Sequence, residues 1–175
     1  MLVLATGCDA DGEAAGLADR VLIGEIDDDT FVAVITDADT VLAYVCDGTP
    51  ATVSVATWFV GPHDGAGFSL THTSGARLVG AIEGELVRGQ YSFGDAALEY
   101  AVADADGEAG LFLADEGELR GGWIVRADGA QRGAVLHRTT GDIVSAQPIK
   151  TTQTQVVLQS DPSPLRRLAS PALPQ

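Results

Sequence analysis

The feature of this sequence that most limits its fold is a regular succession of short apolar segments, each followed by a turn signal. From residue 68 to residue 138 such segments recur about every ten residues, with a glycine-containing pair between them. The pairs are Ser74-Gly75, Glu83-Gly84, Gly94-Asp95, Asp106-Gly107, Glu116-Gly117 and Asp128-Gly129. Short strands joined by two-residue glycine turns are typical of consecutive β-hairpins. The chain is therefore predicted to be all-β and to form an antiparallel meander.

Several predicted strands carry glycine in their interior, where it weakens a flat sheet. These residues are Gly80, Gly89, Gly121, Gly122 and Gly133. Glycine is favoured where strands bend sharply, and a long open meander leaves exposed edges that closure removes. About eleven strands in meander order therefore predict a closed or nearly closed β-barrel. A coiled β-sandwich is the alternative.

Residues 30–48 are predicted to form the most apolar hairpin of the chain. Two apolar runs, residues 31–35 and 41–46, flank an acidic turn, and both faces of each run are apolar. Strands of this kind are covered on both sides in folded proteins. The C-terminal tail, another sheet or a partner chain is expected to cover the second face.

The length of 175 residues fits one domain with a single core. Residues 1–19 are predicted to be an N-terminal spacer or residual export segment, and residues 20–147 a single β-domain. Residues 148–175 are rich in Pro, Thr and Gln and show little periodicity apart from the apolar run 156–158. They are predicted to be a Pro-rich, partly disordered tail.

The charge of the chain argues against several partners. It has 25 acidic and 10 basic residues and a net charge of −15. Such a surface repels nucleic-acid phosphates and anionic membranes, so no nucleic-acid partner is expected. No apolar run reaches the roughly 20 residues of a membrane-spanning helix, so no transmembrane segment is expected either.

Residues 4–8 (LATGC) resemble the lipobox of bacterial lipoproteins, in which the cysteine carries the lipid. The match is good at Gly7 and Cys8, while residues 1–7 lack the basic region of a secretory signal. The resemblance implies a lipid anchor at Cys8 and an extracytoplasmic, lipid-anchored or secreted protein. The alternatives are a short first strand at residues 1–4 and a cytoplasmic location.

The chain has two cysteines, Cys8 and Cys46, too few for a disulfide framework. They either form one bridge in an oxidising compartment, or Cys46 stays a free thiol when Cys8 is lipidated. Because Cys46 ends an apolar strand, we interpret it as a buried small hydrophobic residue rather than a nucleophile.

The acidic segments do not predict a metal site. The sequence DADGEA occurs twice, but with Gly107 at the sixth loop position an EF-hand would need ligands at Val102 and Leu113. A weaker hypothesis is that the aspartates of residues 27–29 and 37–39 gather at one end of the barrel around a divalent cation. A solvated spacer and turns are the preferred interpretation of these segments.

Catalytic motifs are also missing from the sequence. His63, His72 and His137 have no close ligand spacing, and there is no Gly-x-Ser-x-Gly elbow. The glycine-rich residues 61–67 and 117–122 lack the Lys-Ser/Thr of a phosphate loop. No catalytic residue, metal site or cofactor is predicted.

Several strand and turn motifs resemble a family of uncharacterised exported or membrane-anchored β-rich domains of actinobacteria. They are residues 41–48 (VLAYVCDG), Leu70 with residues 74–80 (SGARLVG), and residues 122–125 (GWIV) with Asp128-Gly129. The similarity covers roughly residues 20–138. It implies a β-rich architecture and an extracytoplasmic setting, and it transfers no active site.

Trp58, Tyr100 and Trp123 are the candidates for lining a ligand cavity, with packing in the core as the competing interpretation. The sequence favours a non-catalytic exported or cell-surface β-domain that binds a small apolar ligand or a cell-envelope component. One alternative is a structural or interaction module whose apolar hairpin 31–46 packs on a partner chain. A second alternative is an enzyme with no recognisable local motif.

Overall fold

The computed structural model describes residues 19–173, and all regular secondary structure within them is β-strand. The largest sheet contains β1 (Arg20–Glu25), β2 (Phe31–Thr36), β3 (Thr40–Cys46), β4 (Ala56–Pro62), β5 (Gly67–Thr71), β6 (Arg77–Glu83), β7 (Leu86–Phe93) and β8 (Ala96–Asp104). A second sheet contains β9 (Gly110–Glu116), β10 (Leu119–Val125), β11 (Gln131–His137), β12 (Ile143–Ser145) and β15 (Arg166–Arg167). A two-stranded ribbon pairs β13 (Gln155–Val157) with β14 (Pro162–Pro164).

Strands β1 to β8 form a nearly closed antiparallel barrel, as the meander pattern predicts. Their order is β4-β3-β2-β1-β8-β7-β6-β5, and β1 pairs with β8 through a register that sets Leu22 opposite Asp104. The two strands at the ends of this order, β4 and β5, follow one another in the chain and meet only at the bridge His63↔Phe68. The barrel therefore has one unsealed seam, between β4 and β5.

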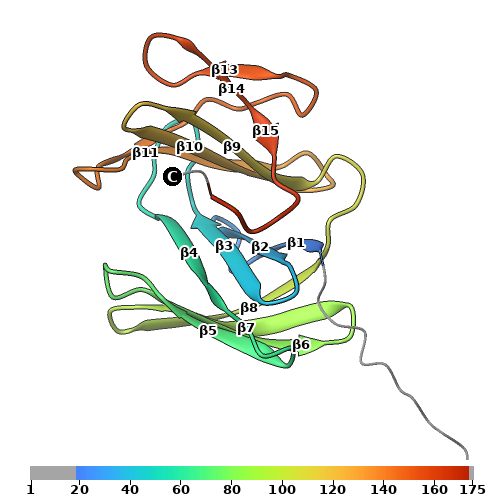
Figure 1. Ribbon diagram of the computed structural model, residues 1–175. Coiled ribbons are helices and arrows are strands. Elements are labelled where there is room, and N and C mark those ends of the chain that lie inside the picture. The colour runs from blue at the N-terminus through green and yellow to red at the C-terminus, as the bar shows by residue number, and fades with distance from the viewer. Residues whose placement is uncertain (1–18, 174–175) are drawn as a thin grey trace, which may run out of the picture.

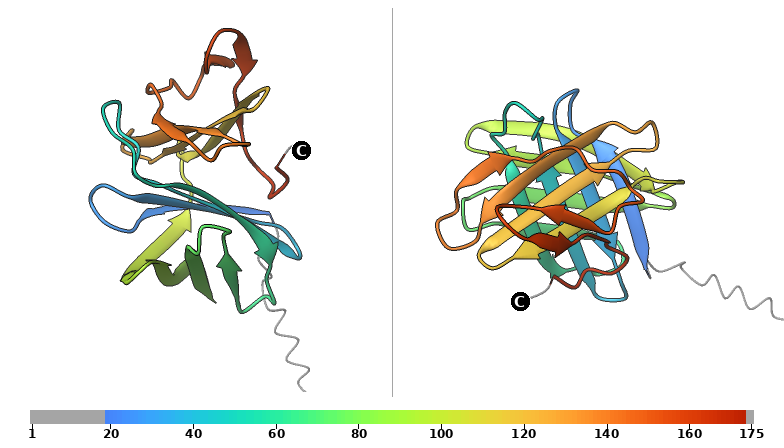
Figure 2. Two further views of the ribbon diagram at one scale, coloured as in Figure 1. Left: turned by 90° about the vertical axis from the view of Figure 1, so that its left-hand side faces the viewer. Right: turned by 90° about the horizontal axis from the view of Figure 1, so that it is seen from above.

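The second sheet stacks on the outside of the wall formed by β1 to β4, so the molecule has three layers (Figure 1). Viewed from above, its strands cross those of the wall beneath (Figure 2). The sequence pattern predicts one continuous meander, whereas the chain leaves the barrel after β8 and starts a separate sheet at β9. The barrel is thus smaller than predicted, and the strands left over form its cover.

The hairpin β2–β3 lies in the middle layer, and both of its faces are buried. Val32, Val34 and Val41 point into the barrel core, together with Phe59, Leu78 and Tyr100. Phe31, Ile35, Leu42 and Tyr44 point outward and pack on Leu111, Leu113 and Ile124 of the second sheet. The chain itself covers the second face of the hairpin, so the hypothesis that a partner chain packs there loses its basis.

The C-terminal segment differs from the predicted disordered tail. Residues 148–173 form β13 to β15, and β15 pairs with β9. Ile149 and Leu165 are buried on the outer face of the second sheet, and Leu168 is buried between this sheet and the barrel. The cause is the apolar outer face of that sheet, where Phe112 and Val135 need cover. Prolines are compatible with this role because β14 pairs on one side only and needs fewer backbone donors.

The barrel wall and the second sheet pack closely together at Gly122. Tyr44 and Trp58 stack with ring centroids 4.1 Å apart, and the edge of this pair faces Gly122 of β10. A Cβ atom at this position would lie 2.6 Å from Cζ2 of Trp58 and 3.0 Å from Cε1 of Tyr44. The glycine is therefore required by the close approach of the two layers.

Replacing Gly122 with alanine is expected to lower the free energy of unfolding by about 1–3 kcal/mol, because the added methyl group overpacks the interface. Urea denaturation followed by tryptophan fluorescence measures the change. In a Trp58→Phe background the same substitution should cost less, since the smaller ring lacks the clashing atom. An equal cost in both backgrounds would contradict this explanation.

Candidate functional site

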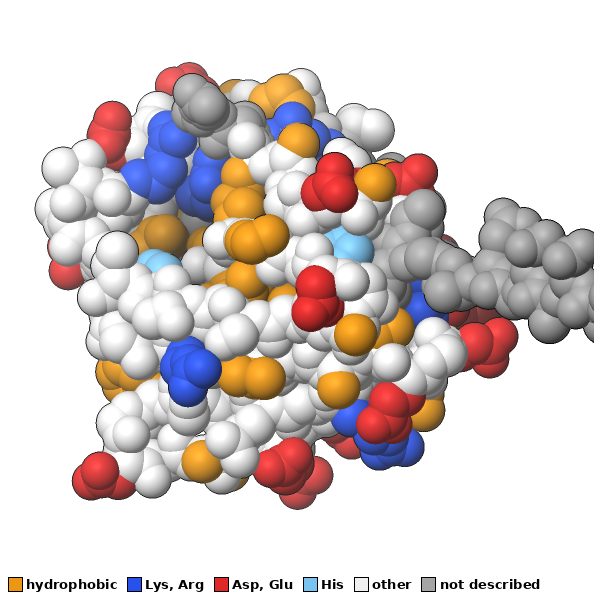
Figure 3. All heavy atoms as spheres, turned by 60° about the horizontal axis from the view of Figure 1, so that its bottom comes forward, with side chains coloured by type: hydrophobic (Ala, Val, Ile, Leu, Met, Phe, Trp, Pro, Cys, Tyr) orange, Lys and Arg blue, Asp and Glu red, His pale blue; other side chains and the backbone are white. Residues whose placement is uncertain are grey.

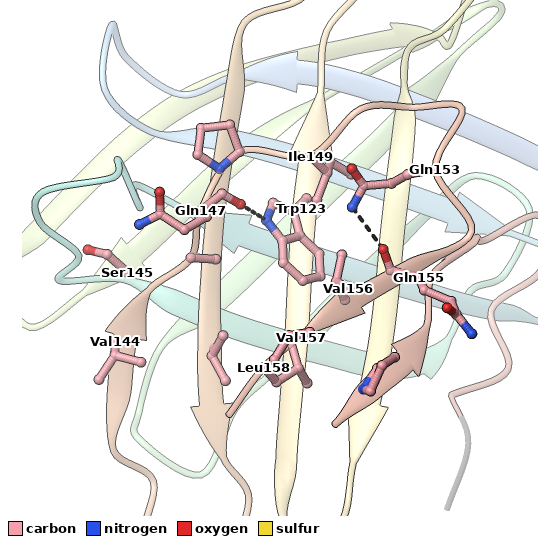
Figure 4. Close-up of a pocket in the computed structure, with 14 residues that line it drawn as sticks. Trp123, Val144, Ser145, Gln147, Ile149, Gln153, Gln155, Val156, Val157 and Leu158 are labelled. Carbon is pink, nitrogen blue, oxygen red and sulfur yellow. Dashed lines mark hydrogen bonds between the residues drawn. The ribbon is translucent and has the colours of Figure 1, made fainter. Parts of the chain in front are cut away.

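A groove of about 540 Å³ lies between the outer face of the second sheet and the C-terminal ribbon (Figure 4). It is the candidate site because it combines an apolar floor with an open rim. Its lining residues come from β10, β11 and β12, from the segment that follows β12, and from the ribbon β13–β14. They are Trp123, Val135, Val144, Ser145, Ala146, Gln147, Pro148, Ile149, Gln153, Gln155, Val156, Val157, Leu158 and Pro162.

Trp123 forms the floor of the groove. Its indole lies against Gly133, the residue directly opposite on β11, and against Gly121. Because neither glycine has a side chain, the ring can lie close to the sheet. A Cβ atom on Gly133 would lie 2.3 Å from Cδ1 of the indole. The indole Nε1–H donates to the carbonyl oxygen of Gln147 at 2.9 Å, which fixes the ring orientation.

Hydrogen bonds made by two glutamine side chains, Gln131 of β11 and Gln153 of the C-terminal segment, hold the polar part of the rim. Gln131 donates to the carbonyl of Ile149 at 2.8 Å and accepts from its N–H at 3.0 Å. Gln153 donates to the carbonyl of Gln155 at 3.1 Å and accepts from the N–H of Lys150 at 2.9 Å. The glutamine side chains thus serve to shape the loop over the groove.

Two valines mark the entrance of the groove and remain in contact with solvent. Val144 of β12 is 59% exposed and Val157 of β13 is 61% exposed; in Figure 4 Val144 lies to the left of Trp123 and Val157 below it. The lining contains no Asp, Glu, Lys, Arg or His. In a chain of net charge −15, an uncharged apolar groove is a local exception to the surface composition.

Glu116 connects the second sheet to the loop between β13 and β14. Its carboxylate accepts the N–H groups of Gln159, Ser160 and Asp161 at 3.2, 3.3 and 3.2 Å. Lost hydration acts to raise the pKa of Glu116, but the N–H groups of Asp161, Gln159 and Ser160 together lower it below its usual value. We call this arrangement the Glu116 latch, since it ties down one end of the ribbon.

Replacing Glu116 with glutamine is expected to loosen the ribbon, because the neutral amide accepts backbone N–H groups less strongly than a carboxylate. Hydrogen exchange measured by mass spectrometry should become faster in residues 155–164. The control is Glu99→Gln, which changes an exposed barrel carboxylate bonded to Gln90 and should leave the ribbon unaffected. Unchanged exchange in the Glu116 variant would contradict the latch.

The same latch gives a pH dependence with a definite sign. The pKa of Glu116 is lower in the folded protein, so the latch stabilises the ribbon above the ordinary carboxyl pKa and loses this effect as the pH falls through the lowered value. Ribbon exchange, corrected for the intrinsic pH dependence, should therefore increase on acidification in the parent protein. The Glu116→Gln variant should lack this added increase.

The three predicted aromatic residues lie in three different cores. Trp123 lines the groove, whereas Trp58 is 9% exposed between the barrel wall and the second sheet. Tyr100 points into the barrel, where its hydroxyl donates to the carbonyl of Val79 at 3.0 Å and burial raises its pKa. They do not converge on one cavity.

The aspartates of the first two turns lie at opposite ends of β2, so they cannot gather at one end of the barrel as the cation hypothesis requires. Asp27 accepts the N–H groups of Asp29 and Thr30, and Asp37 accepts those of Asp39 and Thr40. Both side chains therefore stabilise turns. The two backbone bonds lower the pKa of Asp37.

The histidines occupy separate turns as well. The ring of His63 bonds the carbonyl of Asp37, that of His72 bonds the hydroxyl of Ser74, and that of His137 accepts the N–H of Thr140. Within residues 19–173 no group of three or more His, Cys, Asp or Glu side chains is arranged to hold a metal ion.

Cys46 is completely buried in the interface between the barrel and the second sheet. Burial raises the pKa of its thiol to about 11, which leaves little reactive thiolate at neutral pH. This agrees with the interpretation of Cys46 as a small hydrophobic residue. Cys8, the predicted lipidation position, lies outside the described residues.

Cys46 is expected to resist alkylation by iodoacetamide in the native protein at pH 8 and to react once the protein is unfolded in urea. The reason is that both access and thiolate formation require opening of the interface. Peptide mass spectrometry after timed labelling measures this directly. Rapid labelling of Cys46 without denaturant would contradict the buried assignment.

Sequence reasoning missed most of the groove because it treated residues 148–175 as a tail. The residues missed for this reason include Gln153, Val156 and Val157. The one available signal was the apolar run 156–158 in an otherwise polar segment, which indicates a strand with something to cover. Trp123, by contrast, is predictable as a candidate from its residue type alone.

No family model, curated protein or solved structure matches this chain. The resemblance to exported actinobacterial β-domains stays a prediction. In the part of the chain that the structure describes, no helix has the length and apolar character needed to cross a membrane.

Proposed function

We propose that the protein is a non-catalytic β-domain that binds one small, neutral, apolar ligand in the groove beneath its C-terminal ribbon. The observation that carries the proposal is the uncharged groove itself, which has the buried Trp123 at its base and the exposed side chains of Val144 and Val157 in its lining. A concave site with an apolar lining and a few fixed polar groups is the usual form of a small-molecule site.

The chemistry of the lining favours a neutral ligand. A charged ligand entering the groove would lose hydration without gaining an ionic partner, because the lining has no charged side chain. An apolar ligand instead removes the exposed surface of Val144 and Val157 from water. A free hydrophobic molecule and an apolar chain of a cell-envelope component share this chemistry.

The groove is a better candidate than the barrel interior. Inside the barrel, Phe59, Leu78, Tyr91 and Tyr100 form one packed hydrophobic cluster with the inward valines. A ligand there would have to displace well-packed side chains, whereas the groove is already open. The proposal therefore moves the predicted apolar site from the barrel to the outer face of the second sheet.

The neutral dye N-phenyl-1-naphthylamine, which becomes fluorescent in apolar surroundings, is a suitable probe. We expect saturable binding with one dye per chain, weakened about tenfold by Val157→Asp because the charge must be desolvated at the entrance. The matched control is Val60→Asp on β4, since Val60 is 55% exposed but lies outside the groove. This control should bind the dye normally.

Equal loss in both variants would show that the dye reports general surface hydrophobicity, and no saturable binding would contradict the proposal outright. Native mass spectrometry of protein purified from its own host provides an independent result. A retained neutral ligand, lost in the Val157→Asp variant, would support the groove and would distinguish a free molecule from an envelope lipid by its mass.

We further propose that the domain acts outside the cytoplasm, anchored by a lipid on Cys8. The support is the lipobox-like segment LATGC at residues 4–8, which precedes the first strand by an acidic spacer. The intact mass of protein from its own host tests this. A lipid mass on Cys8 is expected, whereas an unmodified chain that begins at Met1 with a reduced Cys8 would contradict it.

A further inference from the structure

The C-terminal ribbon has two strand edges, and proline blocks only one of them. Leu165 donates its backbone N–H to the carbonyl oxygen of Thr154 at 2.9 Å, at the base of the ribbon. Hydrogen-bonded and non-bonded pairs alternate along an antiparallel ladder. From this pair onward, the register therefore places Pro164 and Pro162 of β14 at positions whose backbone points away from β13. Proline has no N–H, so the outer edge of β14 offers no donor there to a further strand.

The outer edge of β13 keeps its donors. Gln155 lies opposite Pro164 and Val157 opposite Pro162, so the backbone groups of these two β13 residues also point out of the ribbon. In the part of the chain that the structure describes, no acceptor bonds either of the two N–H groups. Strand β13 is therefore an open edge that can pair with one more strand.

The open edge of β13 faces the groove. Strand β14 is the one that contacts β9, and the second sheet has the order β12-β11-β10-β9. Strand β13 consequently lies on the side of the ribbon toward β10, β11 and β12. Gln155 and Val157 line the groove together with Trp123 and Val144, as Figure 4 shows. The open strand edge and the apolar floor thus bound the same space.

A side-chain amide already occupies one acceptor on this edge. Nε2 of Gln153 donates to the carbonyl oxygen of Gln155 at 3.1 Å, which is the kind of bond that the N–H of an added strand would make. The oxygen of the same amide accepts the N–H of Lys150 at 2.9 Å, so the amide is held in place from both sides. Gln153 therefore stands where a peptide group of a ligand would pair.

The surroundings favour an uncharged segment. On the face shown in Figure 3, acidic, basic and hydrophobic side chains are interspersed, whereas the groove lining has no Asp, Glu, Lys, Arg or His. A charged side chain turned toward this lining would lose hydration without gaining an ionic partner. Alternate side chains of a strand point to the same face, so every second residue of an added strand would face Trp123 and Val135. Those residues are expected to be apolar.

We propose that the groove binds an extended, uncharged peptide segment of a partner protein, which pairs with β13 as a third strand of the ribbon. The inference rests on the proposed function, because it names the class of neutral ligand that the groove holds. Carbonyl oxygens of the segment accept the N–H groups of Gln155 and Val157, and its apolar side chains cover Trp123. The volume of about 540 Å³ suits a segment of a few residues.

The probe is the capped peptide acetyl-Thr-Val-Thr-Val-Thr-amide, which is uncharged and has apolar residues at alternate positions. Amide hydrogen exchange of the ¹⁵N-labelled full chain, followed by NMR, is the readout. With free probe at about ten times its dissociation constant, exchange at Gln155 and Val157 is expected to slow about tenfold, because both N–H groups become hydrogen-bonded. The N–H of Val156, which the ribbon itself bonds, should change less.

Two comparisons show whether the backbone is recognised. The same peptide N-methylated at each residue keeps its side chains but cannot pair as a strand, and it should bind about tenfold more weakly. Val157→Pro removes one outward N–H without removing a bond of the ribbon, and it should weaken binding of the probe by a similar factor.

Thr71→Pro is the matched control for the proline substitution. Strand β5 also ends the order of its sheet, its ladder with β6 does not use the N–H of Thr71, and Thr71 lies outside the groove. This variant should bind the probe as the parent does. Slow exchange at Val156 in the Val157→Pro variant shows that the ribbon is still folded.

Slower exchange at Gln155 and Val157, lost with the N-methylated peptide, supports the proposal. It is overturned when exchange at these residues does not change, when the N-methylated peptide binds equally well, or when Val157→Pro has no effect. Protection present without the probe also overturns it. Such protection assigns the edge to a second copy when dilution removes it, and to another segment of the same chain when dilution does not.

The dye experiment distinguishes failure of this inference from failure of the proposed function. When the neutral dye binds the groove and the peptide does not, only the peptide assignment is wrong. When the dye shows no saturable binding, the proposed function itself is wrong. The N-methylated peptide requires no variant, so the comparison does not depend on the folding of a substituted chain.

Discussion

The whole structure depends on burying both faces of the hairpin β2–β3. One face, with Val32 and Val34, completes the barrel core, and the other, with Phe31 and Ile35, needs a separate layer. An eight-stranded barrel covers only the first. The second sheet follows from this requirement, and the C-terminal ribbon follows in turn, because the second sheet has an apolar outer face of its own.

Strand β10 shows how one element serves two of these layers. Its alternation places Gly122 toward the barrel, where the stacked rings of Tyr44 and Trp58 need room, and Trp123 toward the ribbon. The two tryptophans of the chain consequently occupy opposite faces of the same sheet. Trp123 lies at the base of the uncharged groove, whereas Trp58 lies between the barrel wall and the second sheet.

The sequence predicts strands and turns well because both depend on local patterns. Glycine pairs at residues 83–84 and 94–95 do lie at hairpin turns, with Gly84 and Gly94 at positive φ. The division of strands between two sheets depends on contacts between distant residues, which periodicity does not encode. The sequence does not predict the ribbon for the same reason, since a short strand such as β13, which contains Val157, is ordered by the sheet that it covers.

The order of the strands along the chain has a consequence for synthesis. The apolar hairpin is synthesised well before β9 and β10, which cover it. Strand β1 cannot pair with β8 until β8 has been synthesised; Asp104 of β8 lies 84 positions after Arg20 of β1, to which it is hydrogen-bonded. Incomplete chains therefore have exposed apolar surface and an unpaired strand edge, two features that promote aggregation. Mutual repulsion between acidic chains counteracts this hazard. The acidity of the protein therefore limits aggregation during synthesis, and it need not reflect the chemistry of what the folded protein binds.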